Sequence, residues 1–341
     1  MEHKLIIRAK ELLGSGNPRI VIVTHTNPDG DAVGSSLGLY ACLHAAGFRR
    51  SAVIVPNAYP AFLHWLPHND KVLNATEDPE KAEGLIMQAD LVFCLDFNGL
   101  SRTDKLEPVL RKTGGLKLLI DHHPQPEDEF DLVISRTDVS STAELVFEFI
   151  EKMGLAGFLG KDAADCLYTG IVTDTGSFSY ACNNPETYLI TARLIRLGVD
   201  GERIHRLVYH TYSADRMRLL GFCLSEKLVV MPAQETAYIS LTKAEMERFN
   251  HRTGDTEGVV NYALSIGNIS LAALFTENED HIKVSFRSSG QVNVNQLARM
   301  HFNGGGHRNA AGGKSFEDME KTLARFEDLV RSDGLDKSGS E

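Results

Sequence analysis

The sequence predicts an α/β protein of two domains: a larger N-terminal domain with a largely parallel sheet flanked by helices, and a smaller C-terminal α/β domain with a mixed sheet. Three observations support this prediction. In the first half, short runs that are apolar throughout alternate with amphipathic stretches, which is typical of βαβ units. From about residue 226, strand-like segments follow one another more closely. The length of 341 residues suits two domains of about 100–200 residues each.

The elements of the N-terminal half follow from periodicity and from helix-end signals. Strands are expected where the apolar runs lie, at 19–24, 51–56, 89–95 and 116–120. Apolar spacing of three to four residues predicts helices over 2–13, 31–46 and 161–173. Ser141–Glu144 has the sequence of a capping box, which predicts a helix from there to Gly154. Asn184 and Pro185 suit the first positions of a further helix, and 186–222 is expected to be mostly helical.

The C-terminal half has a denser pattern. Strands are expected at 227–232, 236–241, 269–276 and 281–287. Helices are expected at 242–249, 256–266, 293–301 and 316–331. These elements lead to four proposed regions, namely an N-terminal domain over 1–190, a helical connector over 191–222, a C-terminal domain over 223–333 and a frayed polar tail over 334–341.

Composition excludes several classes of protein. No apolar run approaches the ~18 residues that a membrane span needs, and the charged start is unlike a signal peptide. The net charge of −11 argues against a protein that binds long duplexes through a basic face. Five cysteines without a CxxC pair suit buried reduced thiols, so we expect a cytoplasmic protein.

Metal-binding residue types follow the predicted strands. His25, Asp29 and Asp31 come after the strand at 19–24, and Asp96 comes after the strand at 89–95. The strand at 116–120 is followed by Asp121, His122 and His123, and the helix at 161–173 by Asp174. Each group alone is explained as a turn or a helix cap. Together they gather at the carboxyl ends of parallel strands, where functional groups collect, and predict a binuclear metal site. Mixed oxygen and nitrogen donors without cysteine suit Mn²⁺ or Mg²⁺ better than a metal that prefers thiolate ligands.

These segments resemble the motifs of the DHH phosphoesterase superfamily with its DHHA1 companion domain. The resemblance covers nearly the whole chain, and it is closest to the stand-alone oligoribonucleases (nanoRNases) that also dephosphorylate 3′-phosphoadenosine 5′-phosphate; exopolyphosphatases are related to it. It rests on His25–Asp31, Asp96, Asp121–His123, Asp174 and the Gly-rich run Phe302–His307. It implies two ions held by six ligands, with Asp96 bridging, namely His25, Asp29, Asp31, Asp96, His122 and Asp174. It also implies that His123 contacts the scissile phosphate or acts as an acid, while Asp121 orients its neighbours.

The substrate clamp is expected in the C-terminal domain. Glycines at 304–306 would let backbone amides approach a phosphate, because no Cβ blocks it. The resemblance implies that Arg287 and the run Gly304, Gly305, Gly306, His307 and Arg308 bind the non-scissile end of the substrate. A clamp at a set distance from the metals would favour short substrates. Several aromatic residues could stack on a base, although such residues are more often part of a core, namely Phe178, Tyr180, Tyr209, Tyr212 and Phe302.

The expected function is therefore a Mn²⁺-dependent hydrolase in which a metal-activated hydroxide attacks phosphorus. Its substrates would be short single-stranded oligoribonucleotides or linear dinucleotides, cleaved to nucleoside monophosphates, with 3′-phosphoadenosine 5′-phosphate as a further substrate. The alternatives are a cyclic-dinucleotide phosphodiesterase, an exopolyphosphatase or pyrophosphatase, and a non-enzymatic nucleotide-sensing module. No duplex nucleic acid and no membrane is expected as a partner, and a homodimer stays open.

Overall fold

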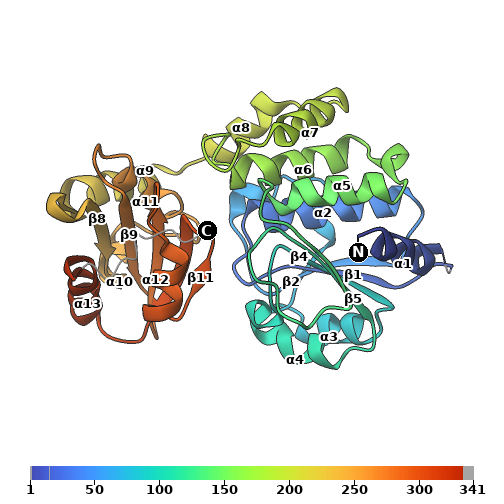
Figure 1. Ribbon diagram of the computed structural model, residues 1–341, viewed down its shortest axis with the longest axis horizontal. Helices are drawn as coiled ribbons and strands as arrows, with labels where there is room; N and C mark the ends of the chain where they lie inside the picture. Colours follow the sequence, from blue (N-terminus) through green and yellow to red (C-terminus); the bar gives the residue numbers. More distant parts are fainter. Residues whose placement is uncertain (1, 15, 333–341) are drawn as a thin grey trace. The chain divides into compact units, whose positions relative to one another are not determined.

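The computed structural model describes residues 2–14 and 16–332. It divides the chain into two compact units, Met1–Thr211 and Tyr212–Glu341 (Figure 1). The segment expected to be a helical connector contributes to both. Helices α7 (Pro185–Arg196) and α8 (Gly201–Tyr209) belong to the first unit, and α9 (Ala214–Phe222) belongs to the second. The expected frayed tail, 334–341, lies outside the described residues.

The first unit is built on a six-stranded sheet in the order β3-β2-β1-β4-β5-β6. All neighbouring strands are parallel, as the sequence predicts for this domain. The strands are β1 (Ile20–Val23), β2 (Ser51–Val55), β3 (Val72–Asn74), β4 (Leu91–Leu95), β5 (Leu116–Asp121) and β6 (Leu132–Ser135). Four coincide with predicted strands. The two edge strands, β3 and β6, were not expected, because they are short and mostly half-buried and therefore lack an apolar run.

Helices cover both faces of this sheet (Figure 1). They are α1 (Glu2–Gly14), α2 (Gly30–Ala45), α3 (Pro79–Met87), α4 (Glu107–Lys112), α5 (Thr142–Lys152) and α6 (Lys161–Asp174), followed by α7 and α8. Alternate side chains of β1 enter different cores. Ile20 and Ile22 pack with α2, α5 and α6, whereas Val21 and Val23 pack with α3 and α4. A strand buried on both faces has to be apolar at every position, which explains the continuous apolar runs.

The order of the strands creates a switch point. β1 lies between β2 and β4, so the chain leaves β1 toward one edge of the sheet and later returns to its other side. The carboxyl ends of β1 and β4 therefore lie next to each other, with crossovers that diverge from them. Open α/β sheets place their functional crevice at such a point.

The second unit has a mixed sheet in the order β11-β12-β10-β9-β8-β7. Only β8 and β9 are parallel among its described pairs. The strands are β7 (Leu228–Met231), β8 (Thr236–Leu241), β9 (Leu271–Glu277), β10 (Ile282–Ser288), β11 (Gly305–Gly306) and β12 (Ala310–Ser315). The helices are α9, α10 (Lys243–Arg248), α11 (Val259–Leu264), α12 (Val294–His301) and α13 (Met319–Arg331). The strands β11 and β12 were not predicted, because glycines at their centre hide the strand pattern.

One core of the second unit is aromatic. Phe275, Phe286, Phe302 and Phe326 are fully buried and make edge-to-face and stacked contacts with one another. Phe302, a candidate for base stacking, is thus a core residue with no exposed surface.

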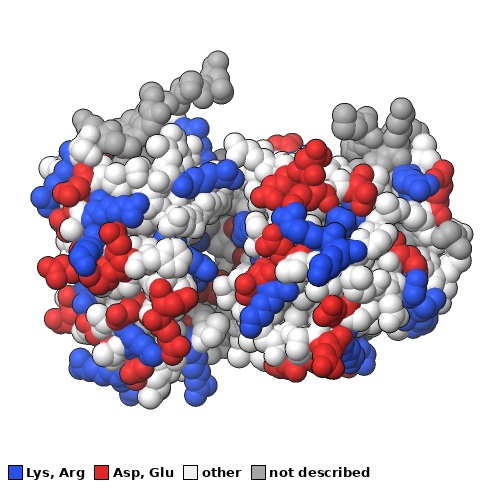
Figure 2. Space-filling model, turned by 90° about the horizontal axis from the view of Figure 1, so that it is seen from below, with Lys and Arg blue, Asp and Glu red and all other residues white. Residues whose placement is uncertain are grey.

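The described helices and surface can be characterised by their hydropathy and charge. None of the helices within 2–14 and 16–332 is both long and apolar enough to cross a membrane. On the face drawn in Figure 2, Lys and Arg side chains alternate with Asp and Glu side chains and do not form an extended basic surface. All five cysteines are free thiols, and four of them are buried.

Candidate metal centre

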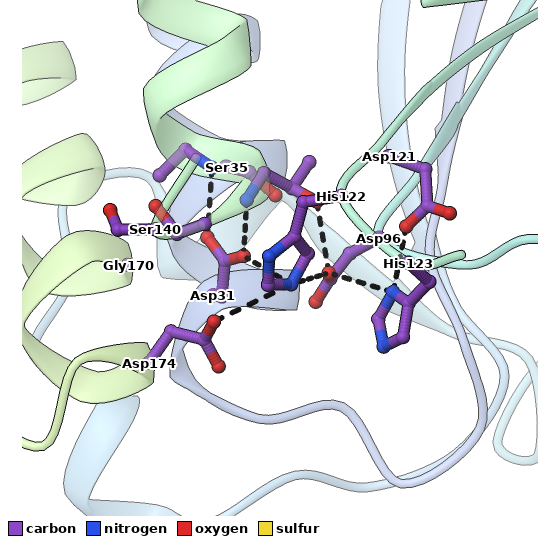
Figure 3. A network of polar contacts seen from close by, with 12 residues as sticks. Asp31, Ser35, Asp96, Asp121, His122, His123, Ser140, Gly170 and Asp174 are labelled. Carbon is purple, nitrogen blue, oxygen red and sulfur yellow. Dashed lines mark hydrogen bonds and ion pairs between the residues drawn. The ribbon is translucent and has the colours of Figure 1, made fainter. Parts of the chain in front are cut away.

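The predicted donors of the first unit converge at the carboxyl edge of its sheet (Figure 3). His25 follows β1, Asp96 follows β4, and Asp121 is the last residue of β5, with His122 and His123 directly after it. Asp174 is the last residue of α6, as the sequence predicts. Four elements that are far apart in sequence therefore supply one cluster of carboxylates and imidazoles.

Asp29 fixes the loop between β1 and α2. It is the N-cap of α2, and its Oδ1 accepts the backbone N–H groups of Asp31 at 3.0 Å and Ala32 at 3.1 Å. Such a cap satisfies amides at the start of a helix that have no partner inside it. Asn57, at the end of β2, braces the same loop, because its side chain pairs reciprocally with Asn27 at 2.7 and 3.0 Å.

Asp31 is buried and held by the N-terminus of α5. Its two carboxylate oxygens accept the backbone N–H groups of Thr142 at 2.6 Å and Ala143 at 2.9 Å. Burial raises the pKa of Asp31 well above its usual value, as do the nearby Asp96 and Asp29, while the two amides lower it. Helix α5 therefore supports a carboxylate that burial alone would keep protonated.

Asp96 lies at the centre of the cluster. Its carboxylate is 3.5 Å from His25 Nε2 and 3.5 Å from His122 Nε2. The Thr142 hydroxyl donates to Asp96 Oδ1 at 2.9 Å. Burial, and after it the charges of Asp29 and Asp174, raise the pKa of Asp96 well above its usual value. Within the described residues, neither Asp96 nor Asp31 has a Lys or Arg partner, so the negative charge here lacks a protein cation.

Three groups of donors in the described part of the chain contain Asp96, and two of them consist only of proposed ligands. The first is His25, Asp29 and Asp96, and the second is Asp31, Asp96 and His122; in each, the ligand atoms lie within 4.8 Å of one another. His122 Nε2 is also 3.4 Å from Asp174 Oδ2. Burial lowers the pKa of His25, which keeps its imidazole neutral and able to act as a ligand. Oxygen and neutral nitrogen donors around a shared carboxylate fit a pair of divalent cations.

Asp121 and His123 form a buried pair beside this cluster. His123 Nδ1 lies 2.7 Å from Asp121 Oδ1, and it lies 3.8 Å from Asp96 Oδ1. Burial raises the pKa of Asp121 to about 7. Among the described residues, Asp121 Oδ2 has no hydrogen-bond partner. This contact fixes the orientation of the His123 ring.

Some supporting residues were not found from the sequence. Thr142 and Ala143 stand next to the predicted capping residue Ser141, whose side chain does cap Glu144 N at 3.2 Å. In a capping box the Glu144 carboxylate would accept from the backbone N–H of Ser141. Here it accepts instead from Ser140, from both the backbone N–H and the hydroxyl. Gly170 of α6 was also missed; a Cβ there would lie 2.8 Å from Asp31 Oδ1. The capping sequence indicates that backbone N–H groups at the start of α5 need acceptors. Only the tertiary fold shows that the Asp31 carboxylate is the acceptor for Thr142 and Ala143.

The aromatic candidates of the first unit make local contacts, and so does the hydroxyl of Ser35 in α2. Tyr209 donates its hydroxyl to Val172 O at 3.0 Å, and Phe178 stacks on Tyr188 at 5.7 Å between ring centroids. Tyr180 is half exposed. In α2, the Ser35 hydroxyl donates to Ala32 O at 3.3 Å. In the second unit, the ring of Tyr212 packs under the guanidinium of Arg216.

The predicted clamp residues lie together at one end of the second unit's sheet. Arg287 is half-buried on β10, opposite Ala310 of β12. The glycine amides expected to receive a phosphate are engaged within the unit: Gly304 N donates to Ala298 O at 3.1 Å and Gly306 N to Asn295 Oδ1 at 3.0 Å. His307 N donates to Ala310 O at 2.7 Å, and the Arg308 guanidinium donates to Gln291.

The glycines serve the packing of the hairpin. A Cβ on Gly304 would lie 1.9 Å from Gly312 O. A Cβ on Gly306, whose φ is +146°, would lie 2.6 Å from Ala310 O. The close approach of β11 to β12 therefore requires glycine at these positions.

Comparison with known proteins agrees with this arrangement. Residues 19–171 match the DHH family, N-terminal domain, and residues 237–332 match the DHHA1 domain. The chain is 30% identical over 316 residues to a bifunctional oligoribonuclease and PAP phosphatase, NrnA, of Bacillus subtilis, covering 92% of this chain and 95% of that protein. It is 31% identical to the protein of that name from Thermus thermophilus, covering 95% and 92%.

Solved structures give the same result. The crystal structure of an exopolyphosphatase-related protein from Bacteroides fragilis is 43% identical, with a TM-score of 0.91 and coverage of 97% of this chain and 96% of that one. A structure of the exonuclease RecJ bound to manganese, at 16% identity and a TM-score of 0.51, shares the fold. Motifs, fold and relatives agree, and the chain belongs to the DHH phosphoesterase family, with a DHH domain followed by a DHHA1 domain.

Proposed function

We propose that this protein is a Mn²⁺-dependent phosphodiesterase and phosphatase. Its substrates would be short oligoribonucleotides or linear dinucleotides, which it would cleave to nucleoside monophosphates, and 3′-phosphoadenosine 5′-phosphate. The main observation in support of this proposal is that two groups of metal-ligand candidates share Asp96 at the carboxyl edge of the sheet. The choice of substrate is supported by the two relatives named as oligoribonuclease and PAP phosphatase, which match over more than nine-tenths of the chain.

The proposed ligands are the six donors of the cluster. His25, Asp29 and Asp96 would hold one divalent ion, and Asp31, Asp96, His122 and Asp174 would hold the other, with Asp96 in common. Mn²⁺ is the proposed ion and Mg²⁺ the alternative, because both accept mixed oxygen and imidazole donors. When bound, such a pair of ions lowers the pKa of a water and neutralises charge on a phosphoryl group.

His123 and Asp121 would supply proton chemistry. His123 Nδ1 lies 2.7 Å from Asp121 Oδ1, so we assign proton exchange with a reacting group to the other ring nitrogen, Nε2. We assign His123 to the scissile phosphate or the leaving oxygen, as a hydrogen-bond donor or general acid. Asp121 would act through His123, by holding its tautomer and ring orientation.

In the DHHA1 domain, we assign the phosphate at the other end of the substrate to Arg287, His307 and Arg308, beside the run Gly304–Gly306. Side chains rather than amides are the proposed contacts, because the amides of Gly304, Gly306 and His307 already donate within the domain. Arginine suits this role, because its planar fork binds phosphate oxygens in pairs.

A second candidate function is the hydrolysis of polyphosphate or pyrophosphate. The observation in its favour is the 43% identity to a protein described as exopolyphosphatase-related. Such an enzyme needs no base pocket, so indifference to the nucleoside would support this candidate.

A substrate panel with metal-stripped protein and added Mn²⁺ tests both candidates. The panel holds linear diadenylate, RNAs of different lengths, 3′-phosphoadenosine 5′-phosphate, cyclic diadenylate, pyrophosphate and polyphosphate, with products separated by chromatography. Rapid conversion of the shortest RNAs to mononucleotides, while long RNA is spared, is the expected result. Preferential release of phosphate from polyphosphate or pyrophosphate would replace the nucleotide assignment and retain the metal site. No metal-dependent hydrolysis of any ester would favour a nucleotide-sensing module.

A further inference from the structure

The segment that follows Asp96 is a rigid turn fastened to the metal loop. The Asn98 side chain donates to Pro124 O at 2.8 Å, and Leu100 N donates to Glu129 Oε2 at 3.2 Å. Thr26 N, from the loop that carries His25, donates to Arg102 O at 2.8 Å. The backbone of Arg102 is therefore fixed next to the loop that supplies three of the proposed metal ligands.

The Arg102 side chain is half-buried, and its guanidinium makes no hydrogen bond or ion pair with any residue that the structure describes. Arg19 and Arg136 of this domain, in contrast, pair with carboxylates, Arg19 with Asp90 at 2.7 Å and Arg136 with Glu148 at 2.8 Å. No nitrogen of Arg102 is among the buried atoms that lack a partner, so its five N–H donors are open to solvent or to a bound anion.

Arg102 lies at the same edge of the sheet as the metal-ligand candidates. It comes seven residues after the end of β4, and His25 follows β1, the strand next to β4. The hydrogen bond from Thr26 N to Arg102 O at 2.8 Å holds Arg102 beside the loop that carries His25.

The charge balance of the proposed centre leaves a role for such a cation. Two divalent ions neutralise the four carboxylates of Asp29, Asp31, Asp96 and Asp174, but not the phosphate of a substrate. In-line attack on phosphorus also moves negative charge onto the non-bridging oxygens. A positioned guanidinium with free donors stabilises that charge, and it does so with two parallel hydrogen bonds.

We propose that Arg102 is a further catalytic residue of the DHH domain, which binds a non-bridging oxygen of the scissile phosphate. This inference rests on the proposed function for its substrate, but its binding part is testable without turnover. It adds a phosphate contact from the metal-bearing domain itself to those assigned to the DHHA1 domain.

The test compares Arg102→Ala and Arg102→Lys with the wild type, using Mn²⁺-loaded protein and linear diadenylate. Arg8→Ala is the matched control, because it removes one positive charge from an exposed pair with Glu11 in the same domain. We expect kcat/KM of Arg102→Ala to fall by about 10²–10³-fold, the typical loss for one donor to a developing oxyanion. Added guanidinium ion should restore part of this rate in Arg102→Ala and none in Arg8→Ala.

Three further readouts separate a catalytic residue from a structural one. Mn²⁺ affinity and melting temperature should stay unchanged in Arg102→Ala, while calorimetric binding of inorganic phosphate to the Mn²⁺-loaded protein should weaken. Unchanged phosphate binding and turnover would overturn the proposal. A loss of Mn²⁺ affinity, or a shifted pH profile with unchanged phosphate binding, would overturn it in favour of a positioning role. If the wild type itself hydrolyses no panel substrate, the proposed function fails, and the phosphate measurement still decides whether Arg102 is an anion ligand.

Discussion

Asp96 has an unusual backbone for its residue type. Its φ is +67°, in the left-handed region that non-glycine residues enter at a cost of roughly 1 kcal/mol or more. The conformation is maintained by its neighbours: Asp96 N donates to Ile120 O at 3.2 Å, and Thr142 donates to its carboxylate. A strained residue held by its surroundings is typical of functional sites, and here it turns the carboxylate from the end of β4 toward both histidines.

Asp96→Asn should separate activity from stability. The amide keeps the size of the side chain and its contact with Thr142 but lacks the negative charge that two ions would share. We expect turnover to fall below detection. We expect the metal-free variant to melt at or above the wild-type temperature, because a buried acid that has to take up a proton or carry an unpaired charge is replaced by a neutral amide. Thermal melting and Mn²⁺-dependent turnover measure the two effects. His122→Ala should also abolish turnover in a folded protein, and wild-type rates in either variant would contradict the assignment.

Substitutions of Thr142 test whether residues that hydrogen-bond to the proposed ligands affect metal binding. Thr142→Val keeps the shape and the amide that binds Asp31 but loses the hydroxyl that binds Asp96. We expect Mn²⁺ affinity to weaken about 10- to 100-fold, as is typical when a ligand loses its supporting hydrogen bond. Thr142→Ser is the control, since it retains the hydroxyl. Equal Mn²⁺ affinity for the Val and Ser variants would show that the bond to Asp96 is immaterial.

Single elements show how far the sequence could predict the site. The donors were predictable, because each follows an apolar strand or ends an amphipathic helix, and the ends of parallel strands meet at one edge. The start of α5 was recognised from Ser141, yet its contact with Asp31 was not, because 111 residues separate the partners. Arg102 does not belong to any motif that we recognised; only the folded turn places it beside the loop that carries His25.

The glycine-rich hairpin was the least predictable element. Its glycines suggested a phosphate cradle, whereas the structure uses Gly304 and Gly306 for close packing of β11 against β12. A run of glycines has no hydrophobic periodicity. The sequence therefore predicted neither the strands β11 and β12 nor the hydrogen bonds that the glycine amides make within the domain. The candidate side chains, Arg287 and Arg308, are unaffected by this difference.

Gly304→Ala should therefore destabilise the DHHA1 domain. The added Cβ would lie 1.9 Å from Gly312 O, so backbone has to move, at a cost of about 1–3 kcal/mol. Gly305→Ala is the matched control, because the nearest atom to its Cβ is Asn295 Oδ1 at 3.5 Å. Chemical denaturation of the full chain measures both variants. Equal unfolding midpoints would contradict the packing role of Gly304.

At the scale of the whole molecule, the buried acids predict that the stability of the metal-free protein decreases as pH rises. The folded-state pKa of Asp121 is about 7 against an ordinary value of 3.8, and burial also raises the pKa values of Asp31 and Asp96 well above that ordinary value. The folded protein thus holds more protons than the unfolded chain in this range, and stability falls as pH rises. We expect the melting temperature of metal-stripped protein to decrease between pH 5 and pH 7. Saturating Mn²⁺ should raise it more at pH 7 than at pH 5, and an equal gain at both would contradict the clustered acids.

The positions of the donors along the chain also determine the order in which they are synthesised. His25 is made first and Asp174 last, and the carboxylate and imidazole groups between them come from β1, β4, β5 and α6. Synthesis of the intervening stretch, about 150 residues at about 5–20 residues per second, takes roughly 8–30 s. During that interval the nascent chain exposes an incomplete set of ligands. A polypeptide arrested before α6 would lack Asp174, so it would contain the donors of the first proposed ion but an incomplete set for the second.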